Sequence, residues 1–97
     1  MEVMIQSVKF DADKKLQDFI REKLNKMERF VENIISADVF LKIDKNSEQG
    51  NKVATIKMEV AGGEFVAERQ AKSFEEAVDL SLDAIRKQID KFKEKHR

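Results

Sequence analysis

The sequence contains no cysteine, proline, tyrosine or tryptophan, and only three glycines and one histidine. Without cysteine, the chain can form neither a disulfide framework nor a thiolate metal site or nucleophile. Its longest apolar runs are only a few residues, far short of what a membrane-spanning helix needs. Residues 1–5 also lack the basic start and long apolar stretch of a secretory signal. We therefore expect a cytoplasmic protein that makes no membrane contact.

Residues that commonly perform catalysis are also scarce. The only histidine, His96, lies one residue from the C-terminus of the sequence, where fraying works against a preorganised catalytic group. The serines have no recognisable histidine or lysine partner, and Gly62-Gly63 is too short to cradle a phosphate. The sequence thus predicts a protein that is not an enzyme, with no metal, no cofactor and no small-molecule substrate.

Charge is balanced overall but segregated along the chain. Nineteen basic and nineteen acidic residues cancel, although proteins that bind nucleic acid usually carry a basic excess. Residues 86–97 hold six Lys or Arg against two acids, whereas residues 35–85 hold six against ten. Residues 1–34 balance at seven of each sign. The chain therefore has an acidic middle and a basic final segment.

Periodicity predicts six regular elements within one domain at residues 1–97. Alternation of apolar and polar side chains predicts strands over residues 2–8, 35–44, 52–60 and 64–69, the last two joined by a tight turn over residues 61–63. Helical spacing predicts one helix over residues 12–31 and another from Ser73 nearly to residue 97. The capping signals are Asp11 and Asp13 for the first helix and Ser73 with Glu76 for the second.

The element order β-α-β-β-β-α predicts an α+β fold. Each helix has one apolar stripe that needs a partner, and that of the first helix includes Phe30 and Val31. The sheet offers one apolar face, to which the second strand contributes alternate residues up to Ile43. We expect the two helices to pack side by side on that face of a four-stranded mixed or antiparallel sheet, which leaves the other face exposed.

The second helix becomes basic on both sides of its apolar stripe as it nears its end. Lys87, Lys91 and Lys95 recur at four-residue intervals on one flank, and Arg86, Lys93 and Arg97 lie on the other. Favourable interaction with the helix dipole explains two or three such cations but not six. This pattern favours a phosphate-binding surface.

The first helix adds Lys15, Glu22, Lys26 and Arg29 along one flank and Arg21 on another. Lys23 falls inside the apolar stripe, so it either lays its stem on the core with its ammonium in water or holds that ammonium in a groove between the helices. Phe40 points away from the core side of its strand, where it could stack on a base or, more simply, contact a neighbouring strand or a protein partner.

With these elements placed, the chain resembles the ribosome hibernation-promoting factor family, also called ribosomal subunit interface or ribosome-associated inhibitor proteins. The resemblance spans the chain: residues 16–30 with their Glu-Lys-Leu and basic-aromatic ending, residues 34–39, the Gly62-Gly63 hairpin, and residues 76–80 followed by Asp83, Gln88, Lys91, Lys93 and Lys95. Single pieces are weak, but their order and spacing together are specific. The chain looks like a short form without a C-terminal dimerisation domain, and we expect a monomer when it is free.

The resemblance implies a fold similar to double-stranded RNA-binding domains and a function in the stress response. Family members occupy the small ribosomal subunit, where tRNA anticodon ends and mRNA would lie, contact rRNA through basic helix surfaces and block translation reversibly. The RNA-binding candidates carried over to this chain are Lys23, Lys26, Arg29, Arg86, Lys87, Lys91, Lys93 and Lys95. The alternative hypothesis is a protein-protein interaction module that uses the open sheet face and Phe40.

Overall fold

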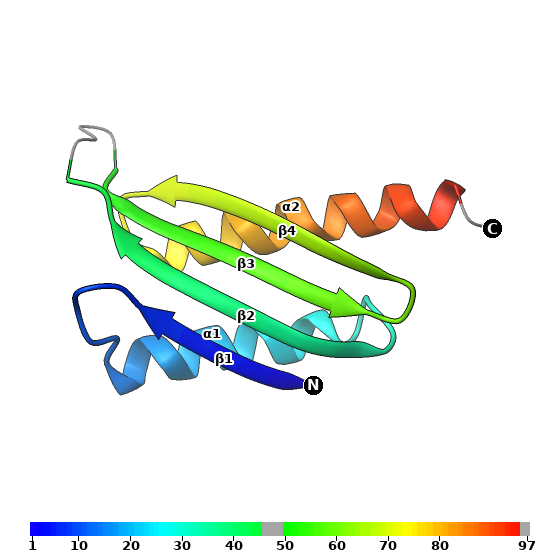
Figure 1. Ribbon diagram of the computed structural model, residues 1–97, viewed down its shortest axis with the longest axis horizontal. Helices are drawn as coiled ribbons and strands as arrows, with labels where there is room; N and C mark the ends of the chain where they lie inside the picture. Colours follow the sequence, from blue (N-terminus) through cyan, green and yellow to red (C-terminus); the bar gives the residue numbers. More distant parts are fainter. Residues whose placement is uncertain (46–49, 96–97) are drawn as a thin grey trace.

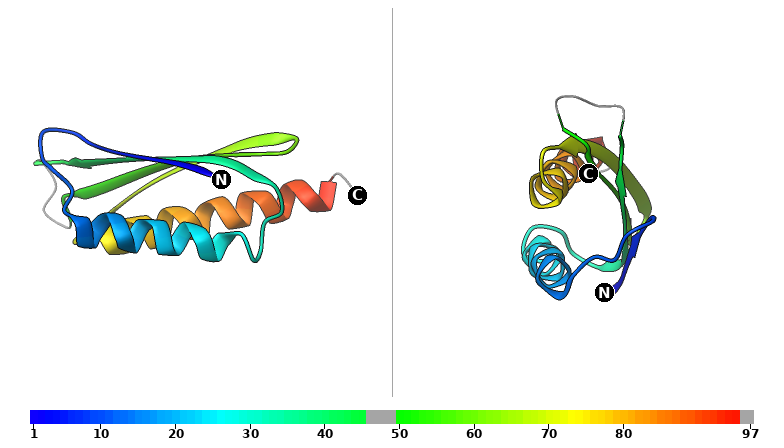
Figure 2. Two further views of the ribbon diagram at one scale, coloured as in Figure 1. Left: turned by 90° about the horizontal axis from the view of Figure 1, so that it is seen from below. Right: turned by 90° about the vertical axis from the view of Figure 1, so that its left-hand side faces the viewer.

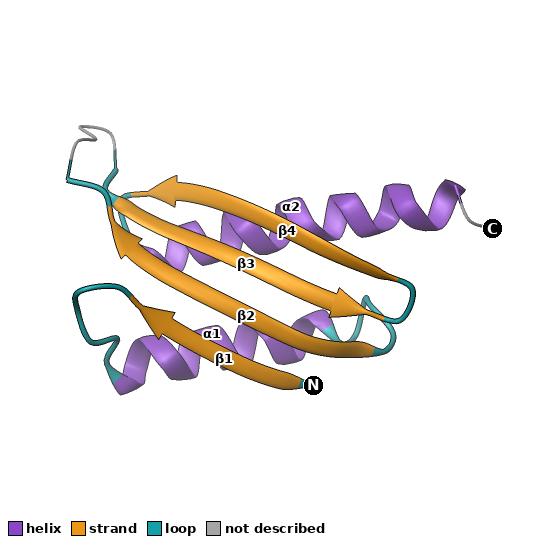
Figure 3. Ribbon diagram, in the orientation of Figure 1, coloured by secondary structure: helices purple, strands orange, loops and turns teal. Residues whose placement is uncertain are grey.

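The computed structural model describes the backbone of residues 1–45 and 50–95, with side chains up to Glu94. Six elements follow in the order that periodicity predicted (Figure 3). They are β1 (Glu2–Ser7), α1 (Lys14–Met27), β2 (Ile34–Ile43), β3 (Lys52–Val60), β4 (Gly63–Ala71) and α2 (Phe74–Lys95). The predicted α+β fold with one four-stranded sheet and two helices is confirmed.

The strands form one mixed sheet in the order β1-β2-β3-β4 (Figure 1). Strands β1 and β2 are parallel and are connected through α1, while β2, β3 and β4 form an antiparallel meander. The tight turn between β3 and β4 depends on Gly62, whose φ of 89° is readily adopted only by glycine.

Both helices lie side by side on one face of this curved sheet and run in the same direction (Figures 1 and 2). Their C-terminal ends therefore lie at the same end of the molecule, and α2 extends beyond α1 there. No helix of the described residues covers the opposite face of the sheet (Figure 2). Cations near the two helix ends are thus brought to one region by the topology.

The core lies between the sheet and the two helix stripes. Alternate residues of β2 and β3 are completely buried there, including Val39, Leu41, Ile56 and Met58. The helices contribute the buried side chains Ile20, Leu24, Val78, Leu82, Ile85 and Ile89. Ile43 was predicted to join this face but is 38% exposed, because it is the last residue of β2, beyond the cover of the helices.

Capping side chains fix where the helices begin. Asp13 is the N-cap of α1, and its Oδ1 accepts a hydrogen bond from the backbone N–H of Leu16 at 2.8 Å. Ser73 does the same for α2 through its Oγ, which accepts from the N–H of Glu76 at 3.1 Å. Each cap satisfies a donor that the first helical turn leaves unpaired, as the sequence predicted.

The end of α1 differs from the prediction, which continued the helix to residue 31. The helix ends at Met27 with Glu28 as its C-cap, and the chain then turns to enter β2 through Asn33, whose φ is 59°. Val31 is buried, but Phe30 is 50% exposed. Assigning Phe30 to the core was therefore wrong, because the turn rotates it out of the apolar stripe.

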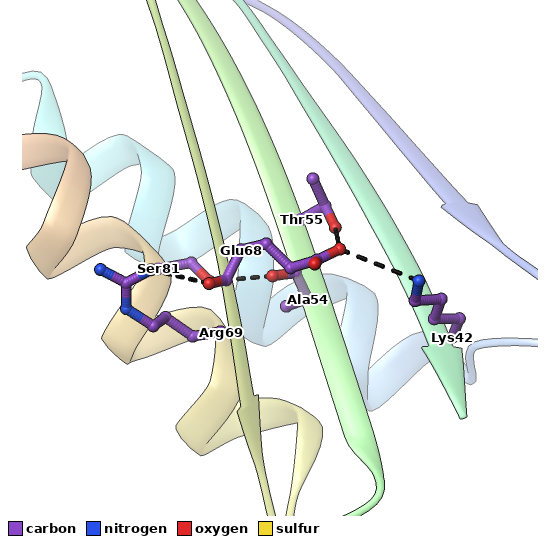
Figure 4. A network of polar contacts seen from close by, with 6 residues as sticks. All are labelled: Lys42, Ala54, Thr55, Glu68, Arg69 and Ser81. Atoms are coloured by element: carbon purple, nitrogen blue, oxygen red, sulfur yellow. Dashed lines mark hydrogen bonds and ion pairs between the residues drawn. The ribbon is translucent and has the colours of Figure 1, made fainter. Parts of the chain in front are cut away.

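Ser81 connects α2 to the sheet. It is the one polar residue that is buried among those the structure describes, and its Oγ donates a hydrogen bond to the carbonyl oxygen of Ala54 on β3 at 2.9 Å (Figure 4). Nearby, Thr55 donates to Glu68 on the open face at 2.6 Å, with Lys42 at 3.9 Å from the same carboxylate. The hydrogen bond from Ser81 to Ala54 thus helps to position α2 along β3.

We expect Ser81→Ala to lower the free energy of unfolding by about 1 kcal/mol, the usual contribution of one buried hydrogen bond. Urea denaturation followed by far-UV circular dichroism measures the change. Ser36→Ala is the matched control, because the Ser36 hydroxyl makes an exposed contact of 3.5 Å with Glu59 and no other hydrogen bond among the described residues. Equal stability of the two variants would show that the Ser81 bond contributes nothing.

Candidate nucleic-acid interface

Lys23 lies in a groove between the two helices. Its ammonium is 3.2 Å from Oδ1 of Asp79 on α2 and 5.4 Å from the centre of the Phe19 ring, and its side chain is 34% exposed. Of the two predicted placements, the structure therefore has the ammonium in the groove. The lysine does not stand alone there, because the carboxylate of Asp79 partly neutralises it.

The next contact is between Arg86 of α2 and Phe30 in the turn that follows α1. The guanidinium carbon of Arg86 lies 4.0 Å from the centre of the Phe30 ring. Such a cation–π contact contributes about 0.5–1 kcal/mol at an exposed site. No carboxylate among the described residues lies within ion-pair distance of Arg86, so its N–H groups remain available to an anion.

A hollow of about 200 Å³ lies between these two contacts. Its floor includes Met27 and Leu82, and Phe30 forms part of its wall. Its remaining lining residues are charged: Lys23, Lys26, Asp79, Asp83 and Arg86. The groove therefore combines an apolar floor with cations and carboxylates at its rim.

Two more predicted cations are paired with acids one turn earlier in their own helices. Lys26 lies 3.6 Å from Glu22, and Lys87 lies 3.0 Å from Asp83. All four side chains are more than half exposed, and exposed pairs of this kind contribute only about 0–1 kcal/mol. A phosphate can therefore compete with these carboxylates for the lysines.

The remaining candidates carry unneutralised charge. Arg29, Lys91 and Lys93 are exposed, and none of them has a carboxylate within ion-pair distance in the described part of the chain. Lys95 is the last residue of α2, and its side chain lies outside the described residues, as do His96 and Arg97. The parallel helices bring the described cations to the end where α1 stops and α2 continues.

The carboxylates of the groove were missed as site residues. The spacing of Asp83 four residues before Lys87 could have indicated an ion pair from sequence alone. No sequence signal paired Lys23 with Asp79, because that contact depends on which helix faces lie against each other. The exposure of Phe30 could not be predicted from sequence, because apolar residues continue at helical spacing past the end of α1.

The opposite face of the sheet is acidic. The strand register places five carboxylates on it against two lysines: Glu2, Asp38, Glu59, Glu64 and Glu68, with Lys42 and Lys57. Each lysine is already paired, Lys42 with Glu68 and Lys57 with Glu64. Phe40 lies among them, partly exposed between Gln6 and Thr55 of the neighbouring strands. The open sheet face is thus acidic, whereas the helices carry cations together with carboxylates, in a chain with no net charge.

Residues 1–45 and 50–95 contain neither a metal-binding cluster nor a membrane-spanning helix. No group of three or more His, Cys, Asp or Glu side chains there is arranged to hold a metal ion. Neither helix in this part of the chain is long and apolar enough to cross a membrane.

A family model described as Sigma 54 modulation protein / S30EA ribosomal protein matches residues 3–97. The chain belongs to this family. A ribosome hibernation promoting factor of Azotobacter vinelandii is 30% identical over 95 residues, covering 98% of this chain and 85% of that protein. The factor of the same name from Pseudomonas putida KT2440 is 27% identical over 95 residues, covering 98% and 89%. The resemblance predicted from sequence is confirmed.

Solved structures with the same fold cover nearly the whole chain. A ribosomal subunit interface protein from Coxiella burnetii has a TM-score of 0.82 at 17% identity, covering 96% of this chain and 98% of that one. The N-terminal domain of Thermus thermophilus Protein Y has a TM-score of 0.81 at 19% identity, covering 95% and 99%. At such identities the likeness establishes the fold of this S30EA family member and no more.

Proposed function

We propose that this protein is a cytoplasmic ribosome hibernation factor that binds rRNA of the small subunit and blocks translation reversibly by occupying the mRNA and tRNA channel. The observation that carries the proposal is the gathering of Arg29, Arg86, Lys91 and Lys93 at one end of two parallel helices. Membership of the S30EA family and relatives named ribosome hibernation promoting factors support the choice of the ribosome as partner.

The mechanism is competitive occupancy without chemistry. The two helices and the sheet form a rigid body that presents cations to backbone phosphates, and the shape of the folded RNA determines the pose. Lys26 and Lys87 exchange their weak, exposed carboxylate contacts for phosphate contacts on binding, and Lys23 meets a phosphate from its place beside Asp79. Bound in the channel as a monomer, the protein excludes mRNA and tRNA sterically. Release restores translation because nothing covalent has changed.

The acidic face of the sheet supports this proposal because it is a surface that RNA is expected to avoid. Its carboxylates repel phosphates, so RNA is expected to approach from the helix side only. The protein would therefore bind in one orientation, with its open sheet face directed away from the contacted rRNA.

Fractionation of a stationary-phase lysate on a sucrose gradient tests the proposal. We expect the protein, detected by antibody, to migrate with small subunits, with whole ribosomes, or with both, and to be depleted from the top of the gradient. Raising the salt of the same gradient should return it to the top fractions, because phosphate contacts weaken with ionic strength. A protein that stays at the top at low salt would contradict ribosome binding.

A further inference from the structure

Phe30 is an aromatic side chain that the fold leaves available. It follows the end of α1, is 50% exposed, and lies outside the core between the helices and the sheet. The guanidinium of Arg86 is held over its ring at 4.0 Å. An exposed ring beside cations is the arrangement with which proteins stack unpaired bases, each stacked base contributing about 1–3 kcal/mol.

The hollow of about 200 Å³ adjoining Phe30 has the three kinds of surface that a nucleotide needs. Met27 and Leu82, each 6% exposed, provide an apolar floor next to the ring. Lys26 and Arg86 stand at the rim, where they can meet the phosphate of the same nucleotide. The three remaining lining residues are Lys23 and the carboxylates of Asp79 and Asp83. Binding to phosphate alone gives no role to the two carboxylates.

These carboxylates retain unused acceptor capacity. Lys23 contacts Oδ1 of Asp79, and Lys87 contacts Oδ2 of Asp83, so the second oxygen of each carboxylate is left to accept a hydrogen bond. Carboxylates of this kind accept from the N4 amino group of cytosine, whereas the O4 carbonyl of uracil would be repelled. The hollow therefore favours a base that presents an amino group.

We propose that the hollow between α1 and α2 binds one unpaired, amino-bearing nucleobase of the RNA partner, stacked on Phe30 and hydrogen-bonded by Asp79 or Asp83. This rests on the proposed function and adds to it, since phosphate contacts alone read shape and not bases. Arg86 has two roles in this arrangement: it covers one side of the Phe30 ring and supplies N–H groups to the phosphate.

Binding of short oligoribonucleotides at low salt tests the stacking. We expect Phe30→Ala to weaken binding of a short oligocytidine about tenfold, the effect of one lost stacked base, and to leave binding of an RNA duplex unchanged. Phe30→Leu, which keeps apolar volume but no ring, should behave like Phe30→Ala, and thermal melting verifies that both variants fold. Phe40→Ala on the other face is the control and should change neither affinity. Loss that is equal for oligocytidine and duplex, or absent for both, overturns the proposal.

Base preference tests the role of the carboxylates. The wild-type protein should bind oligocytidine more tightly than oligouridine of the same length, because only cytosine offers the amino donor. Replacing both acids, Asp79→Asn with Asp83→Asn, should narrow that preference, because an amide both donates and accepts. An unchanged preference in the double variant would remove these two residues from base recognition.

A spectroscopic signal is available because the chain contains no tryptophan. Phe30→Trp introduces a single fluorophore at the ring position, and we expect its emission to be quenched when oligocytidine binds and unchanged when duplex binds. Suppose that reversing Lys87, Lys91 and Lys95 to Glu abolishes co-sedimentation with small subunits, while oligocytidine does not change the Phe30→Trp emission and Phe30→Ala binds oligocytidine like the wild type. Base stacking is then wrong and the proposed function stands. If binding to small subunits is absent altogether, the proposed function fails first.

Discussion

Reversing the charge of Lys87, Lys91 and Lys95 together, each to Glu, is expected to abolish co-sedimentation with small ribosomal subunits. Lys91 is exposed without an acidic partner in the described part of the chain, and Lys87 has only the weak contact with Asp83. Each substitution turns attraction to a phosphate into repulsion, so three of them lower the affinity at least about a hundredfold. Pelleting through a sucrose cushion followed by immunoblotting measures the loss.

The control for this experiment is a protein with the same change of net charge on another surface. Lys42 and Lys57 are on the acidic face of the sheet, opposite the helices, and Lys45 follows the end of β2. Their reversal to Glu should leave co-sedimentation nearly unchanged. Far-UV circular dichroism should be the same for both triple variants, since every substituted residue that the structure describes is exposed. Retained binding by the first variant would exclude the end of α2 from the interface.

The fold was predictable because each element has its own local signal. Period-two alternation marks β2 and β3, helical spacing marks both helices, and Asp13 and Ser73 cap the helices where the sequence placed the caps. The end of α1 was not predictable in this way. Apolar residues continue at helical spacing through Phe30 and Val31, and neither glycine nor proline interrupts them. Only Asn33, a residue that tolerates the left-handed conformation, indicates the turn.

The site was predictable one helix at a time. The angular positions of residues along α2 predict which of them lie on opposite sides of the helix. Arg86 contacts Phe30 at the end of α1, while Gln88 on the other side donates to the carbonyl oxygen of Val66 on β4. Periodicity carries no information about the direction of one helix relative to the other. That direction brings Asp79 to Lys23 and Phe30 to Arg86, so the groove and its partly neutralised lysine emerge only from the tertiary structure.

Salt should weaken ribosome binding steeply. With about five phosphates neutralised, the logarithm of the affinity falls with a slope of about −4 to −5 against the logarithm of salt concentration, so a rise from about 50 to 200 mM costs roughly 500-fold. Co-sedimentation or fluorescence titration over that range measures the slope. Lys93→Ala should reduce its magnitude by about one, because Lys93 is exposed and has no acidic partner among the described residues. Equal slopes for the two proteins would mean that Lys93 meets no phosphate.

The same titration separates RNA binding from the alternative of a protein-interaction module on the open sheet. Contacts through Phe40 and the exposed apolar residues Met4 and Val66 of the same sheet face would bury apolar surface, and salt affects such burial little. Phe40→Ala would then reduce ribosome binding more than charge reversal on α2 does. We expect the reverse order, because three lysines lost from the basic end remove contacts that release counterions, whereas Phe40 lies among five carboxylates that RNA avoids. If salt left the affinity for ribosomes unchanged and Phe40→Ala reduced it strongly, the binding surface would be the open sheet face and not the helices.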